Sequence, residues 1–273
     1  MRGFFLTVAT LLLANGSILA AEVEVKGKPT ATPAQAPARA TATPVASPAA
    51  ALPQFRPALL GAGPASVINR MDAAGLILDG QKDGAVSFSC SVRKTGEIAN
   101  VWTYRGTPDS KLLERELVRC LDTAVFAPAM HNRQTVHALF FGTVTFKVVD
   151  GKPRLRIFAN QEPEELKKES DFVGPQPFVG PGSKFEGLHY PNDSLTSELS
   201  GIVEIALKVD ASGNMKELKI ISETPPLAGF RRAAAEDFRV ASFIPAFRDG
   251  KPVECSVTLP VYYEPMPPQP PSE

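Results

Sequence analysis

The chain has 273 residues, which is enough for two domains of ordinary size. Its 29 basic and 29 acidic residues give a formal net charge of zero, which removes the electrostatic case for binding nucleic acid or an anionic membrane surface. The 26 prolines gather between segments rather than inside them, so they mark the limits of the folded parts.

The first residues have the pattern of an export signal. A short basic start is followed by an apolar run, and small residues stand near Ala20 and Ala21. Asn15 interrupts the apolar run well before the ~20 residues that span a bilayer. We expect residues 1–21 to be a cleaved signal peptide, with an uncleaved N-terminal anchor as the alternative; both export the rest of the chain.

Residues 22–63 consist largely of alanine, threonine and proline. Such a composition cannot bury an apolar core, so an extended, disordered spacer is predicted over this range.

Residues 64–150 form the first predicted folded unit. Apolar and polar residues alternate on both sides of a turn at Gly96, as in a hairpin with one buried face. Leucines at helical spacing follow, and a third strand closes the unit. The predicted elements are strands at 84–92 and 98–104, a helix that begins at Thr107-Pro108 and buries Leu113, Leu117, Leu121 and Ala124, and a strand over Thr135–Val148.

Residues 151–186 are predicted to be a connector. Arg154–Phe158 has the composition of an extra strand, Glu162–Ser170 that of a short charged helix, and Gly174–Gly182 that of a hinge.

The same pattern returns 117 positions later. Residues 84–129 align without a gap to residues 201–246, and 11 of the 46 aligned positions are identical, which is more than unrelated sequences share. The second unit, residues 187–264, is therefore predicted to repeat the first, and the proline-rich tail 265–273 to be extended. Its elements are strands with Val203, Ile205, Leu207 and Val209 inward and at Met215–Ile221, a helix that begins at Thr224-Pro225 and buries Phe230, Ala234, Phe238 and Ala241, and a strand over Val253–Tyr263.

The predicted fold class is α+β, with two tandem β-β-α-β units. Each unit is a three-stranded antiparallel sheet with a helix on one face. If the third strand pairs beside the first, it leaves one edge free, and an unpaired edge accepts another strand.

The second unit contains several short motifs in a fixed order and spacing. They are Tyr190-Pro191, Gly201-x-Val203, Val209-Asp-Ala-Ser-Gly213, Phe243-Ile-Pro-Ala246, Asp249-Gly250 and Leu259-Pro-Val-Tyr-Tyr263. Through these motifs the second unit resembles the C-terminal domain of TonB-type energy transducers from His189 to Tyr263, and the first unit resembles a diverged copy of it.

The resemblance implies a periplasmic protein that binds a peptide segment of an outer-membrane transporter by strand addition. Inner-membrane partners would supply the energy of the proton-motive force, and paired sheet edges could form a homodimer. Tethering by residues 1–21 to the inner membrane is the alternative location. The alternative function is an exported interaction or scaffold module of the same fold without energy coupling. The candidate peptide-binding residues are Val253, Cys255, Val257 and Leu259 along the edge, with Tyr190 and Pro191 at its end.

No residue set indicates catalysis, a cofactor or a metal. The histidines at 131, 137 and 189 lack ligand spacing, and no nucleotide or hydrolase motif occurs in the sequence. Cys90 and Cys120 are both placed on the core side of the first unit, so an exported protein could join them in a disulfide; two buried thiols are the alternative. We expect Cys255 to be a small core residue rather than a reactive thiol.

Overall fold

The structure, a computed structural model, describes residues 52–191 and 198–265. The predicted signal peptide, the spacer up to residue 51 and the tail from residue 266 lie outside these residues. The α+β class is confirmed, because the strand pairs among the described residues are all antiparallel and the helices are few. In the described part of the chain, no helix combines the length and apolar character needed to cross a membrane.

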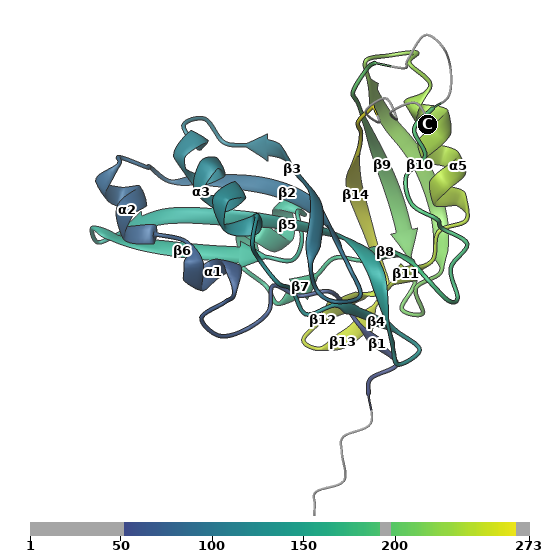
Figure 1. Cartoon of the computed structure of the whole chain (residues 1–273), viewed down its shortest axis with the longest axis horizontal. Helices are drawn as coiled ribbons and strands as arrows, with labels where there is room; N and C mark the ends of the chain where they lie inside the picture. Colours follow the sequence, from purple (N-terminus) through teal and green to yellow (C-terminus); the bar gives the residue numbers. More distant parts are fainter. Residues whose placement is uncertain (1–51, 192–197, 266–273) are drawn as a thin grey trace, which may run out of the picture. The chain divides into compact units, whose positions relative to one another are not determined.

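The first sheet contains eight strands, not the three that were predicted. Its main path runs β1-β4-β5-β2-β3, while β6 and β8 pair with β5, and β11 pairs with β8 (Figure 1). The strands are β1 (Phe55–Arg56), β2 (Gly84–Val92), β3 (Ile98–Gly106), β4 (Ala129–His131), β5 (Gln134–Val149), β6 (Lys152–Phe158), β8 (Gln176–Val179) and β11 (Phe243–Ile244). The short helices α1 (Val67–Arg70) and α2 (Ala73–Leu78) precede β2.

One helix, α3 (Lys111–Leu121), covers the first sheet at β2 and β3. The predicted stripe is confirmed, because Leu113, Leu117, Leu121 and Ala124 are all buried. They pack against the inward residues of β2, among them Phe88 and Val92. This alternation of inward and outward residues at a period of two fixes which face of the sheet the helix covers.

The predicted free edge of the first unit is largely occupied. Strand β5 pairs with β2 over Ala138–Phe146, and its residues Thr143–Phe146 also pair with β6. At its other end Ala138 pairs with β8 as well. Because these residues have a partner on each side, β5 has no room there for a further strand.

The predicted spacer 22–63 extends too far. Phe55 and Arg56 pair with β4, and Leu59 exchanges backbone hydrogen bonds with Ala127. Ala58 is fully buried, and its N–H and C=O bind the side-chain amide of Gln176. Pro57 and Ala58 are buried and Phe55 is half-buried, so folding begins several residues before position 64.

The predicted hinge in the connector is also wrong. The extra strand exists as β6 and the charged helix as α4 (Pro163–Lys168), but Gln176–Val179 form strand β8 instead of a flexible joint. Strand β8 pairs with β5 and with β11. Phe178 of β8 is fully buried in the core of the first sheet, which explains why this proline- and glycine-flanked segment is ordered.

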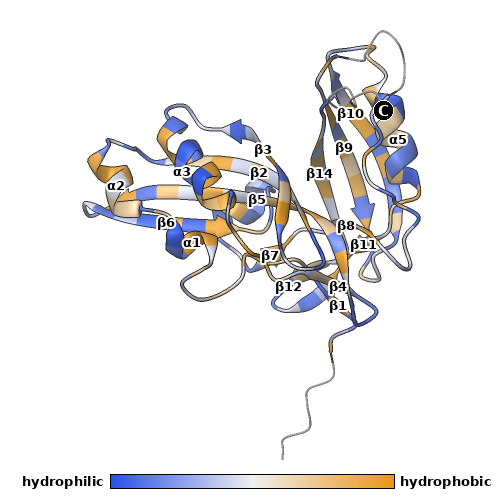
Figure 2. Cartoon of the chain, in the orientation of Figure 1, coloured by the Kyte–Doolittle hydropathy of each residue, from blue (hydrophilic) through white to orange (hydrophobic). Residues whose placement is uncertain are grey.

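The second sheet has the predicted strand order, β10-β9-β14. Its strands are β9 (Gly201–Val209), β10 (Met215–Thr224) and β14 (Cys255–Tyr263), and the helix α5 (Phe230–Arg239) covers it. Phe230, Ala234, Phe238 and Ala241 are buried as predicted, against Val203, Ile205, Leu207 and Val209 of β9. Figure 2 shows hydrophobic and hydrophilic residues alternating around α3 and α5, as expected of helices with one buried face.

A third, small sheet has the order β13-β12-β7. Its strands are β7 (Phe172–Val173), β12 (Ala246–Arg248) and β13 (Lys251–Val253). The predicted closing strand Val253–Tyr263 is therefore divided, since Val253 pairs with Ala246 in this sheet and only Cys255–Tyr263 pair with β9.

Both helices begin later than the Thr-Pro pairs predicted. Thr107 still belongs to the end of the β2–β3 hairpin, because its N–H donates to the Ala85 carbonyl, and Ser110 is the N-cap of α3. Helix α5 begins at Phe230, where the carboxylate of Glu223 accepts the N–H of Arg231.

Candidate functional site

Strand β14 is the candidate site because, within residues 52–191 and 198–265, no backbone pairs with one of its two sides. All nine residues pair with β9 in a continuous register, from Cys255 opposite Val209 to Tyr263 opposite Gly201. Among the described residues, β9 is the only strand that pairs with β14.

The hydrogen bonds of Thr258 show which residues face the unpaired side. The N–H of Thr258 donates to Glu162 Oε1 (3.1 Å), and its carbonyl accepts from Gln161 Nε2. Both groups therefore point away from β9. Because main-chain groups alternate along an antiparallel strand, those of Ser256, Pro260 and Tyr262 point the same way as those of Thr258. We call these groups the outward side of β14.

Pro260 supports this assignment. It lies opposite Glu204 in the middle of an unbroken register, although proline has no N–H to give to the ladder. Proline is tolerated within a sheet where its missing N–H would face away from the partner strand. The outward side therefore offers both main-chain groups of Ser256 and Tyr262, but only the carbonyl of Pro260.

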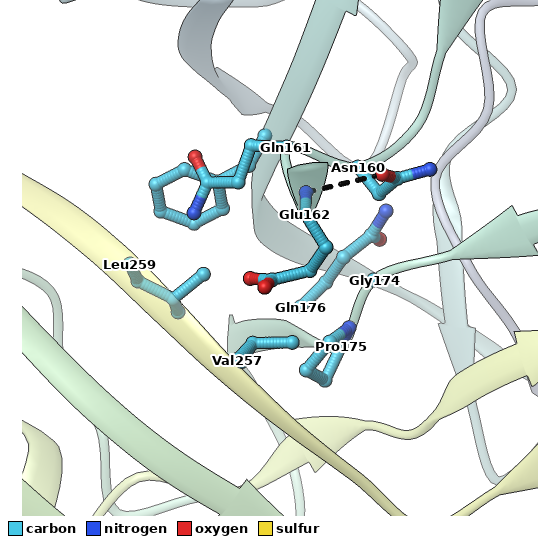
Figure 3. A pocket seen from close by; sticks show the side chains of 9 residues that line it. Asn160, Gln161, Glu162, Gly174, Pro175, Gln176, Val257 and Leu259 are labelled. Carbon is cyan, nitrogen blue, oxygen red and sulfur yellow. Dashed lines mark hydrogen bonds between the residues drawn. The ribbon is translucent and has the colours of Figure 1, made fainter. Parts of the chain in front are cut away.

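Gln161 and Glu162 hold the middle of the outward side, and we call this pair the clamp. Figure 3 shows both side chains next to β14, above Val257 and Leu259. Gln161 Oε1 in turn accepts the hydroxyl proton of Tyr104 from β3. Burial raises the pKa of the Glu162 carboxyl, and the N–H of Thr258 counteracts part of this shift. The small cavity beside Glu162 has a volume of about 10 Å³, room for roughly one water.

A groove of about 1120 Å³ lies beside the C-terminal half of β14. Its walls come from β2, β3 and β5 of the first sheet, from residues 185–190 and from β14 itself. The Trp102 ring stacks on Tyr262, with centroids 4.7 Å apart and planes 11° apart, and Arg105 pairs with Glu204 at 3.6 Å. Strand β3 therefore lies over the helix-free side of β14 and β9, and the outward groups of Tyr262 open next to this groove.

The predicted edge residues have different positions. The side chains of Val257 and Leu259 are buried in the core under α5, and Cys255 packs against that core. Their main-chain groups belong to the ladder with β9, so these residues support the edge instead of presenting it. Val253 is not on this edge at all.

Tyr190, one of the two residues proposed at the end of the edge, reaches the end of β14 through Phe230, and Pro191 follows it in the chain. The Tyr190 hydroxyl donates to the Leu199 carbonyl (2.6 Å), and its ring meets Phe230 edge-on at 5.7 Å. Phe230 stacks on Tyr263, the last residue of β14. This packing makes Tyr190 a support for the strand end.

The residues that sequence reasoning missed are Gln161, Glu162, Trp102 and Tyr262. Pro260 was a usable signal, because a proline within a strand predicts an edge whose even-numbered neighbours face outward. Nothing in the sequence indicates that the clamp, about a hundred positions earlier, reaches Thr258.

The three cysteines are free thiols, so the predicted Cys90–Cys120 disulfide is absent from the structure. The Cys120 thiol points instead along α3 to Glu116, at 3.7 Å from Oε1. Burial raises the pKa of all three thiols, that of Cys255 to about 12. A thiol needs its thiolate form to act as a nucleophile, so this arrangement does not favour cysteine chemistry. Within residues 52–191 and 198–265, no cluster of three or more metal-ligating side chains occurs.

Comparison with known families agrees with this geometry. Residues 186–265 match the family model described as Gram-negative bacterial TonB protein C-terminal, a range that includes β9, β10, α5 and β14. Searches of curated proteins and of solved structures found no significant match. The match does not include residues 64–150, so the diverged copy in the first unit stays a prediction.

The matched family consists of protein-interaction domains and not of enzymes, which is consistent with the prediction that the protein is not an enzyme. Its members are periplasmic or anchored in the inner membrane, and the family suggests a TonB-like role in outer-membrane transport. Residues 186–265 are a TonB-type C-terminal domain.

Proposed function

We propose that the protein is a periplasmic TonB-like protein that binds a peptide segment of an outer-membrane transporter by strand addition to the outward side of β14. The observation that carries the proposal is the unpaired side of β14 in the sheet that the family match covers. Each main-chain hydrogen bond to an added strand contributes a net ~0.5–1.5 kcal/mol, so a few bonds fall short of the ~8 kcal/mol of micromolar binding and side-chain contacts must supply the rest.

The groove supports this proposal because it provides room for side chains of an added strand. Trp102, Tyr262 and Tyr263 line it with aromatic surface, while Ser89, Ser91 and Asn100 supply polar groups. In strand addition, main-chain bonds provide affinity and such side-chain contacts provide selectivity. Energy-dependent transport is the process that this binding would serve, with inner-membrane energy-harvesting proteins as further partners.

The experiment that tests strand addition uses prolines at outward positions. Full-length protein is titrated calorimetrically with synthetic heptapeptides that cover the N-terminal segments of outer-membrane transporters. Ser256→Pro and Tyr262→Pro each remove an outward N–H and should weaken binding by about tenfold or more. Ser256→Ala and Tyr262→Ala keep the N–H and serve as matched controls.

A proline at Val257 would be a poor test, because its N–H belongs to the ladder with β9 and the variant would lose stability. Strand addition at β14 is wrong if both outward prolines bind the peptides like their alanine controls. Absence of binding by every variant and by the wild type would remove the peptide-binding proposal itself.

A scaffold module without energy coupling remains the second candidate. The observation that favours it is the pairing of β8 with β11, which joins the residues before the matched domain to those within it. A domain held in this way can present a fixed surface to exported partners. Dependence of transport in cells on both the protein and the proton-motive force would exclude this alternative, as would a mature N-terminus that retains residues 1–21 in the inner membrane.

A further inference from the structure

The clamp imitates a neighbouring strand at one residue of β14. A paired strand would offer an acceptor to the N–H of Thr258 and a donor to its carbonyl. Glu162 Oε1 supplies the acceptor at 3.1 Å, and Gln161 Nε2 supplies the donor. Since both main-chain groups of Thr258 are used, an incoming strand cannot pair there while the clamp is closed.

The clamp is a built part of the fold and not a loose surface loop. Gln161 is 5% exposed and accepts the Tyr104 hydroxyl proton, so β3 orients its amide. The preceding Asn160 is 2% exposed and donates to the Phe172 carbonyl at 2.8 Å. Its side-chain oxygen accepts the N–H of Glu162 at 3.2 Å, directly before helix α4 begins. The two clamp residues are thus fixed from both sides.

We propose that the Gln161–Glu162 clamp is an internal competitor that the partner peptide must displace to pair along the whole of β14. This inference rests on the proposed function, because it concerns the regulation of the same edge. In the free protein the clamp forms hydrogen bonds with the N–H and the carbonyl of Thr258 in the middle of the edge. It thereby also protects the edge against pairing with unrelated strands.

The open end of the edge indicates where displacement begins. Pro260, Val261, Tyr262 and Tyr263 line the groove, whereas Thr258 is covered by the clamp. A peptide can therefore pair first at Tyr262 and then extend toward Ser256 as the clamp leaves. When the clamp opens, Glu162 regains water around a carboxylate that is partly desolvated in the closed form.

The test compares clamp variants of the full-length protein with the same transporter heptapeptides. The double variant Gln161→Ala/Glu162→Ala removes both competing groups, and we expect its peptide dissociation constant to fall about tenfold. Glu162→Gln keeps an acceptor for the N–H of Thr258 but has no charge, and it should bind the peptides like the wild type. This variant separates the loss of the clamp's hydrogen bond from the loss of the carboxylate charge. Glu164→Ala, which removes an exposed carboxylate two residues away, is the surface control.

Amide hydrogen exchange measured by NMR provides a second readout that does not depend on affinity. In the wild type the Thr258 amide should exchange slowly, and the Ser256 and Tyr262 amides quickly. The double variant should expose Thr258 to exchange, and peptide binding should protect it again. Thermal unfolding of each variant shows whether the fold is retained, and a double variant that fails to fold is replaced by Glu162→Ala alone.

The outcomes separate this inference from the proposed function. If the peptides bind the wild type and the double variant equally, the clamp inference is wrong and the proposed function stands. If the gain in affinity survives when Ser256→Pro is added, the peptide does not pair along the edge and both are wrong. If neither protein binds any peptide, both are likewise overturned.

Discussion

The two sheets share their order of elements but differ in the surroundings of the closing strand. In both, a hairpin is followed by a helix and by a strand that pairs beside the first strand of the hairpin. The closing strand β5 is 16 residues long and has partners on both sides at Ala138 and Thr143–Phe146, while among the described residues the nine-residue β14 is paired on one side. The same order of hairpin, helix and closing strand can therefore give a covered edge in one region and an open edge in another. The outcome depends on whether the residues after the closing strand return and pair with it.

The residues after each closing strand account for this difference. After β5, the tight turn at Asp150-Gly151 returns the chain as β6, which pairs along the same strand. After β14, Glu264 and Pro265 are followed by residues outside the described part. The connector meets β14 through two side chains and not through a paired backbone.

Proline in the two closing strands is expected to give the largest contrast. Thr145 pairs with Ala85 on one side and Arg156 on the other, so Thr145→Pro must break a ladder bond and should lower the free energy of unfolding by about 3 kcal/mol or more. Ser256→Pro removes an outward N–H and should cost less than about 1 kcal/mol. Chemical denaturation measures both values. Equal costs would contradict the assignment of the two sides of β14.

A second contrast uses a contact that the two regions share. Gly96 and Gly213 both have positive φ, and each carbonyl accepts the N–H of a phenylalanine after the helix, Phe126 or Phe243. A Cβ at either position would lie 2.1 or 2.0 Å from that phenylalanine's carbonyl oxygen. Gly96→Ala and Gly213→Ala should therefore each cost about 2–3 kcal/mol.

Gly250 is the matched control, with positive φ but no atom within 4 Å of an added Cβ; Gly250→Ala should cost about 1 kcal/mol. Denaturation curves compare the three variants. If Gly96→Ala lowers the free energy of unfolding markedly less than Gly213→Ala, the repeat does not extend to this turn.

The ion pair between Glu165 of α4 and Arg248 of β12 tests how the two regions are held together. Two bonds of 2.7 and 2.9 Å from Arg248 lower the pKa of Glu165 to about 2. A carboxyl whose pKa is lowered by folding stabilises the protein above its ordinary pKa of about 4.3, and this contribution is lost as the pH falls toward 2. Because the Arg248 side chain is 40% exposed, solvent screening limits the contribution to about 1 kcal/mol.

Thermal unfolding of the wild type and Glu165→Gln at several pH values measures this effect. The wild type should be more stable at pH 6, and the difference should vanish near pH 2. A difference that does not change with pH would mean that the pair contributes nothing through its charge.

The smallest expected effect is spectroscopic. Trp102 is the only tryptophan of the chain and stacks on Tyr262 beside the edge. Peptide pairing at Tyr262 should change its emission, and Tyr262→Ala, which loses a stack worth about 0.5–1.5 kcal/mol, should shift the emission to longer wavelength. Emission that stays constant while calorimetry detects saturation would place the peptide away from this end of β14.

Local periodicity explains which parts of the fold were predictable. The alternation around Phe88 and Ile205 and the helical spacing of Leu113 and Phe230 each depend on residues close in sequence, and the structure confirms their burial. The eight-stranded sheet depends on pairings over long separations, such as β5 with β8, which leave no period in the sequence. The same holds for the clamp, because a single side chain that binds a distant backbone group has no repeating signature.

The anchoring of Ala58 has a mechanical consequence. Tension that reaches residue 52 from the N-terminal side enters the protein through the two-residue strand β1 and the amide of Gln176, which binds both main-chain groups of Ala58. The load then passes through β4 to β5, and through Gln176 to β8, which pairs with β11 of the TonB-type domain. The first sheet therefore transmits any load between the N-terminal side and the outward side of β14. We expect the contacts of residues 55–59 to break first when the chain is stretched.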